Sequence, residues 1–276
     1  MSDAPLALVT GSGRGIGGAA VRCLLADGLR VIALDRSAQG LEELSGTLRS
    51  DALSTRAFDL SQTAQIPSLV KALLDKHGPI TRLVNNAGTW VGGPILELDD
   101  RTWQTNFDVN VTAPFALMRG LVPAMIESGG GVGAGGGIGA IVNVSSRNAF
   151  RSSTNNAAYD ASKAALVALT RTAAGEFAAH GVRVNAVCPG VVRTPGTPGT
   201  PEIDQPLFKA AYTKLIPMAR YAEPSEIAAV IRFLLSDAAS FMTGQAVVVD
   251  GGQIACQDNG RFMEVPGLER GVPGRP

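Results

Sequence analysis

Histidine and cysteine, the residues of most metal centres, disulfide frameworks and histidine-based active sites, are scarce in this sequence. Its 276 residues include two histidines and three cysteines. Cys23, Cys188 and Cys256 form no C-x-x-C pair and are odd in number, so we expect free thiols in a reducing compartment. His77 and His180 each precede a glycine and fit the last turn of a helix. We therefore expect neither a metal site nor a histidine-based triad.

Charge of one sign and long apolar runs are lacking as well. The 24 lysines and arginines balance the 24 aspartates and glutamates, so no basic surplus indicates nucleic acid or an anionic membrane as a partner. No apolar run reaches the roughly 18–20 residues of a membrane-spanning helix. The N-terminus enters a strand pattern too early for a signal peptide. We expect a soluble, cytoplasmic protein that acts on a small molecule.

Apolar residues, in contrast, make up 45% of the chain against 17% charged residues, which is enough for a sizeable core. Short apolar runs alternate with longer amphipathic stretches. The expected strands are 6–10, 30–34, 55–58, 82–85, 140–145, 182–187 and 246–249, and the expected helices lie near 15–27, 38–49, 62–77, 99–127, 155–180 and 224–236. Strands without polar alternation are typical of a parallel sheet covered on both faces. The pattern predicts an α/β fold with one Rossmann-type, doubly wound domain over residues 1–252, whose seven-stranded parallel sheet is flanked by helices.

Three segments interrupt the alternation. Residues 129–139 are mostly glycine and lead into a strand at the end of the sheet opposite to ligand sites, so we interpret them as a flexible insertion rather than a phosphate cradle. Residues 193–214 are rich in proline, follow a strand at the ligand-binding end and fit a substrate lid. Residues 253–276 form a C-terminal tail after the last strand.

A glycine-rich turn, TGSGRGIG at residues 10–17, joins the first strand to the first helix. Glycines let the backbone turn tightly and approach a pyrophosphate, and the helix N-terminus offers N–H groups and partial positive charge. A plain turn is the alternative, but the position between strand and helix favours dinucleotide binding. The residues predicted to bind it here are Gly11, Arg14, Gly15, Ile16 and Gly17.

Asp35 ends the second strand, eighteen residues after Gly17. A carboxylate there can accept hydrogen bonds from the adenosine ribose and repels a 2′-phosphate, which favours NAD over NADP. Arg14 and Arg36 leave NADP open as the less favoured cofactor.

Tyr159 and Lys163 lie four residues apart in YDASK, on one face of an expected helix. The pKa of an unperturbed tyrosine is about 10, and a nearby ammonium is expected to lower it. The two residues can form an acid/base pair without histidine. A solvated helix face carrying both residues is the alternative.

The chain resembles the short-chain dehydrogenase/reductase family over residues 6–252. The resemblance rests on motifs that occur in the family's order and spacing: TGSGRGIG (10–17), Asp59, NNAG (85–88), Asn110, Ser145-Ser146, YDASK (159–163) and PGVVRT (189–194).

The resemblance implies roles for these residues. Ser146, thirteen residues before Tyr159, would bind the substrate oxygen. Tyr159 would transfer the proton, and Lys163 would hold the nicotinamide ribose and lower the tyrosine pKa. The resemblance also implies that Asp59, Leu60 and Asn86 lie on the adenosine side and Val192 and Thr194 near nicotinamide. It further implies a homotetramer, in which the helices near 99–127 and 155–180 pack across subunits.

Asn110 matches the family's fourth catalytic residue, which anchors a water molecule in a proton relay to lysine. Pro114 lies four residues later and has no N–H, so the Asn110 carbonyl loses its usual helical partner and can hold water. A kink that serves only packing is the alternative.

Position after the motifs predicts a substrate pocket formed by the 195–214 segment and five further residues, Trp90, Asn148, Phe150, Asn156 and Val191. An aromatic wall with amides suits a secondary alcohol or ketone of the polyol, sugar or aryl type. We expect an NAD-dependent oxidoreductase for such substrates. The alternatives are an NADPH-dependent ketoacyl-type carbonyl reductase and a non-catalytic dinucleotide-sensing or scaffold protein.

Overall fold

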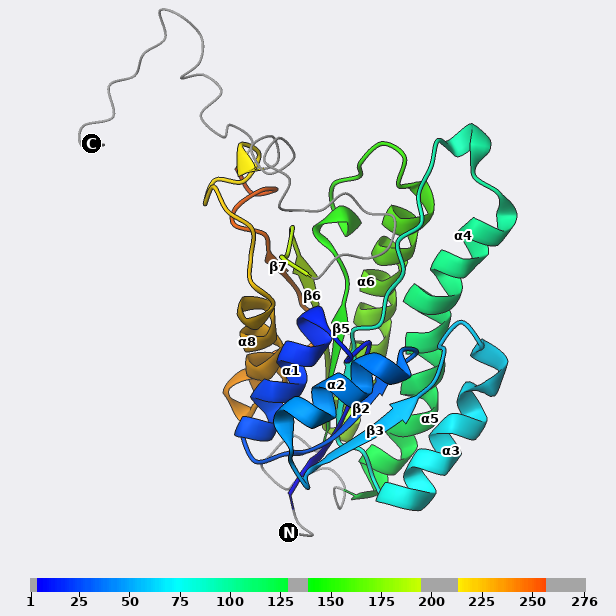
Figure 1. The fold of residues 1–276 in the computed structure, drawn as a ribbon, viewed down its shortest axis with the longest axis vertical. Coiled ribbons are helices and arrows are strands. Elements are labelled where there is room, and N and C mark those ends of the chain that lie inside the picture. The colour runs from blue at the N-terminus through cyan, green and yellow to red at the C-terminus, as the bar shows by residue number, and fades with distance from the viewer. Residues whose placement is uncertain (1–3, 129–138, 195–212, 257–276) are drawn as a thin grey trace, which may run out of the picture.

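Seven parallel strands run through the centre of the protein, which we describe from a computed structural model covering residues 4–128, 139–194 and 213–256 (Figure 1). The strand order is β3-β2-β1-β4-β5-β6-β7. All six neighbouring pairs are parallel, which confirms the predicted fold class. The strands are β1 (Leu6–Thr10), β2 (Arg30–Asp35), β3 (Leu53–Ala57), β4 (Arg82–Asn85), β5 (Gly139–Val144), β6 (Val182–Pro189) and β7 (Ala246–Val249).

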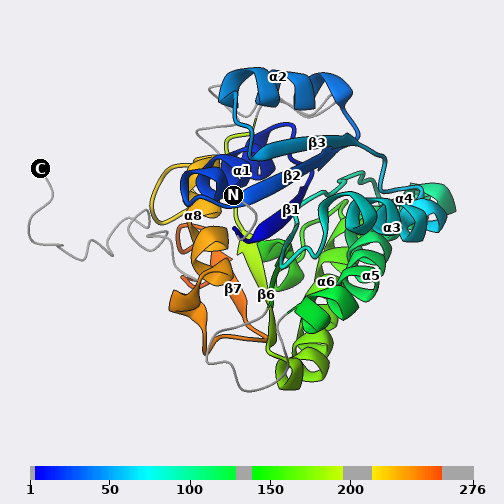
Figure 2. The same cartoon turned by 90° about the horizontal axis from the view of Figure 1, so that it is seen from below.

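Helices cover both faces of the sheet (Figure 2). The helices α1 (Gly15–Ala26), α2 (Ala38–Leu48) and α8 (Pro224–Leu235) lie on one face. The helices α3 (Ile66–His77), α5 (Ala113–Ser128) and α6 (Ala157–Phe177) pack on the other. Every residue of β1, β5 and β6 is buried. The apolar run of β1 predicted this, whereas β6 is buried although Arg183 and Asn185 alternate with its apolar residues. β7 is only partly buried in spite of its valines, and β3 is mostly exposed.

The two faces of the sheet carry separate apolar layers. Leu8 and Ile32, neighbours in the register of β1 and β2, point into the layer formed with α3 and α5. Val9 and Ala33, one residue further along, point into the layer formed with α1 and α8. This alternation fixes the strand register, because a shift by one residue would exchange the two layers.

The expected helix at 99–127 is interrupted in the structure. It consists of α4 (Asp100–Phe107), a π-helical turn η3 (Asp108–Thr112) and α5. The Ala113 N–H donates to the carbonyl of Asp108, five residues earlier. The π-helical turn ends two residues before Pro114, which supplies no N–H to a regular helical ladder. The prediction of one regular helix was therefore wrong at its centre.

The same run corrects a second expectation. Within the described part of the chain, residues Asp100–Ser128 are long and apolar enough to span a membrane by composition, whereas no such stretch was expected. Half of that apolar window is buried inside the protein. Leu117, Leu121 and Met125 of α5 are fully buried in the core, so packing against the sheet accounts for the apolar character of the run.

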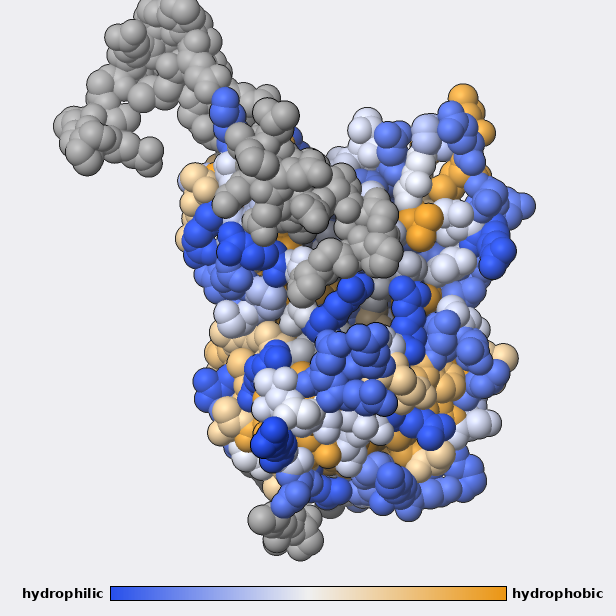
Figure 3. All heavy atoms as spheres, in the orientation of Figure 1, coloured by the Kyte–Doolittle hydropathy of each residue, from blue (hydrophilic) through white to orange (hydrophobic). Residues whose placement is uncertain are grey.

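The other expected segments agree with the structure to within a few residues, including the third strand, expected at 55–58 and found at Leu53–Ala57. Gly78 and Gly181 follow the two helical histidines with φ values of 80° and 75°, as the glycine caps required. Most of the expected insertion, lid and tail (129–138, 195–212 and 257–276) lies outside the described residues. Ahead of α4, Ile95 and Leu96 are exposed at 73% and 98%, and apolar side chains gather at this tip in Figure 3.

Candidate active site

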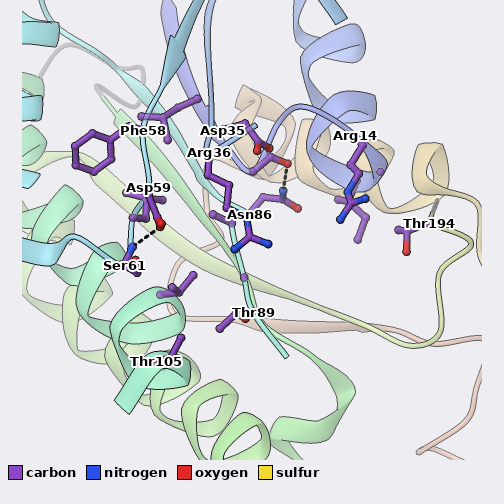
Figure 4. A pocket seen from close by; sticks show the side chains of 18 residues that line it. Arg14, Asp35, Arg36, Phe58, Asp59, Ser61, Asn86, Thr89, Thr105 and Thr194 are labelled. Atoms are coloured by element: carbon purple, nitrogen blue, oxygen red, sulfur yellow. Dashed lines mark hydrogen bonds between the residues drawn. The ribbon is translucent and has the colours of Figure 1, made fainter. Parts of the chain in front are cut away.

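A cleft of about 320 Å³ opens at the carboxyl ends of β1, β2 and β4 (Figure 4). Chain order reverses between β1 and β4, and such a switch point is where ligands bind in open α/β sheets. Nine of the residues predicted from sequence to bind a cofactor line this cleft: Gly11, Arg14, Gly15, Ile16, Asp35, Asp59, Leu60, Asn86 and Thr194.

The end of β1 is tied to the loop after β4. Thr10 Oγ1 accepts hydrogen bonds from the backbone N–H groups of Asn86 and Ala87, both at 3.0 Å. The Asn86 side-chain amide donates in return to the carbonyls of Thr10 and Gly11, both at 2.9 Å. Gly11 has a φ of 63°, and a Cβ there would lie 2.7 Å from Ala87 Cα. Only glycine fits this turn, which leaves the backbone bare toward the cleft.

The first turn of α1 faces the same cleft. Arg14 is the N-cap of α1, its side chain makes no capping bond, and Gly15 and Ile16 of the first turn line the cleft. Gly17 is buried against the turn: a Cβ there would lie 2.2 Å from the Gly11 carbonyl oxygen. Gly17 therefore does not line the cleft; it lets the helix approach the strand closely.

Asp35 is the last residue of β2 and lines the cleft. One carboxylate oxygen accepts from the Gly13 N–H and the other from the Ser37 N–H, both at 2.9 Å. The carboxylate thus anchors the glycine-rich turn as well as facing the cleft. Arg36 also lines the cleft beside it (Figure 4). Asp59 lies after β3, and its carboxylate accepts a hydrogen bond from the Ser61 N–H at 2.9 Å.

The predicted acid/base pair lies on the N-terminal half of α6. Lys163 Nζ lies 5.7 Å from the centre of the Tyr159 ring. The lysine is 4% exposed and donates to the Val144 carbonyl at 3.0 Å. Ser145 Oγ donates to the Lys163 carbonyl at 2.8 Å. Of the two candidate serines, Ser145 thus serves to hold α6 against β5, whereas Ser146 interacts with the Tyr159 phenol.

Asn110 connects α6 to the loop after β4. Its side chain accepts from the Thr89 N–H and donates to the Thr89 carbonyl, both at 2.9 Å, and it also donates to Ser162 Oγ. A Cβ on Gly88 would lie 3.3 Å from both Asn110 Oδ1 and Lys163 Nζ. Gly88 itself lines the cleft, so the cleft and the residues around Lys163 meet at this glycine.

Burial is the main influence on the pKa values of Tyr159, Lys163 and Cys188. It raises the pKa of Tyr159, and the lowering by the Ser146 hydroxyl does not compensate. Burial also lowers the pKa of Lys163 to about 8. The expectation of a depressed tyrosine pKa is thus wrong for the protein without ligand, because desolvation of the phenolate outweighs its favourable partners. Burial raises the pKa of the neighbouring Cys188 thiol to about 11.

The residues predicted to contact substrate divide into several groups. Trp90 Nε1 donates to Asn156 Oδ1 at 2.6 Å, which joins the loop after β4 to the start of α6. Phe150 is 47% exposed. The Asn148 side-chain amide donates to Asp160 Oδ1 at 2.6 Å in a buried hydrogen bond. Val191 lines a separate small cavity of about 70 Å³.

Val192 was predicted to lie near the nicotinamide but does not line the cleft. It is 8% exposed and forms an isolated parallel bridge with Ala222. The bridge includes hydrogen bonds from the Arg193 N–H to the Ala222 carbonyl and from the Ala222 N–H to the Val191 carbonyl. This bridge fixes the chain just before Thr194, whose methyl group lies 3.1 Å from where a Cβ on Gly15 would be.

Several residues that line the cleft were not predicted from sequence. Those at strand ends had a local signal, because they directly follow or end β2, β3 and β4. Thr105 and Val109 had none, because α4 and the π-helical turn bring them in from a distant part of the fold. The unpredicted lining residues are Leu34, Phe58, Ser61, Ala87, Gly88, Thr89, Thr105 and Val109.

Comparison with known proteins agrees with this geometry. A family model of short-chain dehydrogenases, described as enoyl-(acyl carrier protein) reductase, matches residues 11–253. A galactitol 2-dehydrogenase (L-tagatose-forming) from Cereibacter sphaeroides is 39% identical over 91% of this chain and 95% of that protein. A D-threitol dehydrogenase from Mycolicibacterium smegmatis is 36% identical over 91% and 93%.

A reductase and a solved structure extend the comparison. The 3-oxoacyl-acyl-carrier-protein reductase of Thermotoga maritima is 34% identical over 91% of this chain and 98% of that protein. A solved structure of 4-hydroxyisoleucine dehydrogenase complexed with NADH is 32% identical, with a TM-score of 0.82 over 92% of this chain and 100% of that chain. Because the family model and these relatives each cover most of the sequence, this chain belongs to the short-chain dehydrogenase/reductase family and is an oxidoreductase.

Proposed function

We propose that the protein is an NAD-dependent dehydrogenase that transfers hydride between nicotinamide and a secondary alcohol or ketone, with Tyr159 as the acid/base. The observation that carries the proposal is the position of Tyr159 and Lys163. They lie four residues apart on α6, and Lys163 Nζ lies next to Gly88, which lines the same cleft as Asp35.

The cleft fits a dinucleotide. Gly11 and Gly15 line the cleft at positions where a Cβ would crowd Ala87 and Thr194, and the first turn of α1 offers N–H groups to a pyrophosphate. Asp35, which accepts from the Gly13 N–H and lines the same cleft, suits the adenosine ribose hydroxyls and disfavours a 2′-phosphate. Asp59, Leu60 and Asn86 would line the adenosine side, and Thr194 and Val192 would lie toward the nicotinamide. When bound, nicotinamide supplies the carbon that exchanges hydride with the substrate.

The residues of this chain would handle the proton. During alcohol oxidation the Tyr159 phenolate accepts the hydroxyl proton while Ser146 holds the substrate oxygen. A charged Lys163 holds the nicotinamide ribose and favours the phenolate by its positive charge. The carbonyl of Asn110, at the π-helical turn, would anchor a water molecule that passes the proton on from Lys163.

Polyols and sugars are the substrate class we favour, with aryl alcohols next. The relatives at 39% and 36% identity are named as dehydrogenases of galactitol and threitol. Trp90 and Asn156, joined by a hydrogen bond, present an aromatic ring and an amide at the start of the catalytic helix. Phe150, Asn148 and Val191 stay candidates for this pocket.

An NADPH-dependent ketoacyl-type reductase is the second candidate. It is favoured by Arg14 and Arg36, whose guanidinium groups line the cleft and suit a 2′-phosphate, and by the 34% identity to a 3-oxoacyl reductase. Steady-state rates with polyols, aryl alcohols and a 3-oxoacyl thioester, each with both cofactors, distinguish the two candidates.

We also propose a homotetramer in the cytoplasm, where the three free cysteines would stay reduced. An apolar groove of about 520 Å³ lies between α5 and α6. Its lining includes Phe115, exposed at 43%, together with Val122 and Ile126. Packing of α4, α5 and α6 on a second copy would cover this groove, and light scattering of the purified protein measures the assembly.

Replacement of the phenol tests the proposed chemistry directly. Tyr159→Phe keeps the ring but removes the proton acceptor, so turnover should fall by roughly 100- to 10,000-fold while NADH binding stays unchanged. Tyr221→Phe removes a different buried phenolic hydroxyl and serves as the control, with turnover near wild type. If Tyr159→Phe keeps more than about a tenth of the wild-type kcat at saturating substrate, Tyr159 is not the acid/base.

A further inference from the structure

The residue that follows the proposed acid/base is a buried carboxylate. Asp160 is 6% exposed and lies in the first turn of α6. One of its oxygens accepts from the Asn148 side-chain amide at 2.6 Å, and the other accepts from the Ser153 N–H at 2.7 Å. Within the described residues, no lysine or arginine forms an ion pair with it. Two short bonds from neutral donors thus hold a negative charge inside the protein.

These bonds lead to Ser146. The backbone N–H of Asn148 donates to Ser146 Oγ at 3.1 Å, while its side chain is held by Asp160. A serine hydroxyl has one hydrogen to donate. Because the Asn148 N–H approaches Ser146 Oγ as a donor, the serine hydrogen must point elsewhere, and the Tyr159 phenol is its partner on the other side. The position of Asn148 therefore determines how Ser146 presents its hydroxyl.

We propose that Asp160 is a positioning residue. Through Asn148 it fixes Ser146 Oγ for the substrate oxygen, and it places a fixed negative charge beside the reacting phenol. The proposal rests on the function proposed above for Tyr159 and Ser146. It explains why α6 buries an acidic side chain where an apolar one would cost less to bury.

The charge of Asp160 acts on Tyr159 together with the other groups around it. Asp160 raises the pKa of Tyr159, whereas Arg147, on the segment that also carries Ser146, lowers it. A neutral residue at 160 removes one of the opposing contributions and makes the phenolate easier to form. The titratable, charged and hydrogen-bonding groups that face the phenol are Ser146 and Arg147 after β5, Asp160 and Lys163 on α6, and Cys188 on β6.

Two substitutions separate the charge of Asp160 from its geometry. Asp160→Asn removes the charge and leaves one acceptor for two donors. The pH midpoint of kcat for alcohol oxidation should move down by about 1 unit, and the plateau should fall about 10-fold. Asp160→Glu keeps the charge on a longer side chain, so the plateau should fall while the midpoint stays near wild type. A merely structural role would leave both midpoints unchanged.

A third variant tests the path through Asn148 and carries the test if Asp160→Asn does not fold. Asn148→Ala keeps the carboxylate, so the plateau should fall with no change in midpoint. Combined with Asp160→Asn, the two losses should be far from additive, because both break the same chain of contacts. Thermal unfolding and fluorescence titration with NADH show that each variant folds and binds cofactor.

The possible outcomes are distinct. An unchanged midpoint in folded Asp160→Asn, a wild-type plateau in Asn148→Ala, or additive losses in the double variant would each overturn the role of Asp160. These results test the role of Asp160 only if the wild-type enzyme turns over and the Tyr159→Phe variant loses that activity. If that condition fails, the proposed function itself is wrong.

Discussion

One methyl group at Gly17 tests whether close contact between α1 and the glycine-rich turn shapes the cofactor cleft. A Cβ at Gly17 would lie 2.2 Å from the Gly11 carbonyl oxygen and 2.6 Å from the Asn86 side-chain amide. Both neighbours are fixed, because that amide donates to the Gly11 carbonyl at 2.9 Å. Gly17→Ala must therefore shift the turn or the start of α1. Gly46→Ala is the matched control, since Gly46 also lies in a helix but has nothing within 4 Å of its added Cβ.

Both substitutions gain the higher helix propensity of alanine, but only Gly17→Ala also crowds its neighbours. Alanine is better than glycine in a helix by up to about 1 kcal/mol, so Gly46→Ala should be neutral or slightly stabilising. Overpacking at Gly17 costs about 1–3 kcal/mol, so Gly17→Ala should unfold more easily than the control by about that amount. The displaced turn should also weaken NADH binding at least 10-fold, which corresponds to about 1.4 kcal/mol.

Urea unfolding measures the stability difference, and quenching of protein fluorescence by NADH measures the dissociation constant. The reasoning fails if Gly17→Ala binds NADH as tightly as Gly46→Ala. It also fails if both variants lose affinity equally, because the effect would then come from substituting any helical glycine.

Two further predictions concern charge. Asp35→Ala should lower the ratio of kcat/KM for NAD to that for NADP at least 10-fold, because the 2′-phosphate is no longer repelled and Arg36 can bind it. The ratio is the quantity to measure, because loss of the hydrogen bonds to Gly13 and Ser37 weakens the binding of both cofactors alike. A wild type that prefers NADP would show the assignment to be wrong. The pKa of Lys163 is lowered by burial from 10.5 to about 8, so between these pH values the unfolded chain keeps a proton that the folded protein has released. The free energy of unfolding should therefore rise with pH across this window by up to about 3 kcal/mol relative to that of Lys163→Met. If urea unfolding shows the same pH dependence for both proteins, the buried amine does not titrate as inferred.

The sheet and the cofactor turn could be predicted because their signals are local. β1 and β2 are built on apolar runs, and the glycine-rich turn lies directly between β1 and α1, where the sequence pattern shows it, although the atoms that its glycines must avoid at Asn86, Ala87 and Thr194 come from elsewhere in the chain. Asp35 was predictable for the same reason, since it ends a strand whose neighbours were clear. The π-helical turn at 108–112 was not, because Pro114 interrupts the regular ladder without specifying which irregular turn replaces it.

The direction in which the Tyr159 pKa is shifted could not be predicted from the sequence, for a different reason. Spacing showed the lysine four residues away, but the pKa depends on how much water reaches the phenol. Burial of the phenol is the largest influence on its pKa, ahead of Ser146, Arg147 and Cys188. A favourable neighbour can be recognised from sequence, whereas desolvation is a property of the assembled fold.

The polar face of α6 shows how such a site can be buried at all. Asp160, Ser162 and Lys163 are 6%, 0% and 4% exposed, although a helix with these residues in its first turns looks solvent-facing. Each has a partner from elsewhere in the chain: the Asn148 amide for Asp160, the Asn110 amide for Ser162 and the Val144 carbonyl for Lys163. A buried polar group costs little only while its partner is present. The π-helical turn and the end of β5 therefore do more than support α6: they determine which of its polar residues can stay buried, and substitutions there should act on the proposed chemistry without touching substrate.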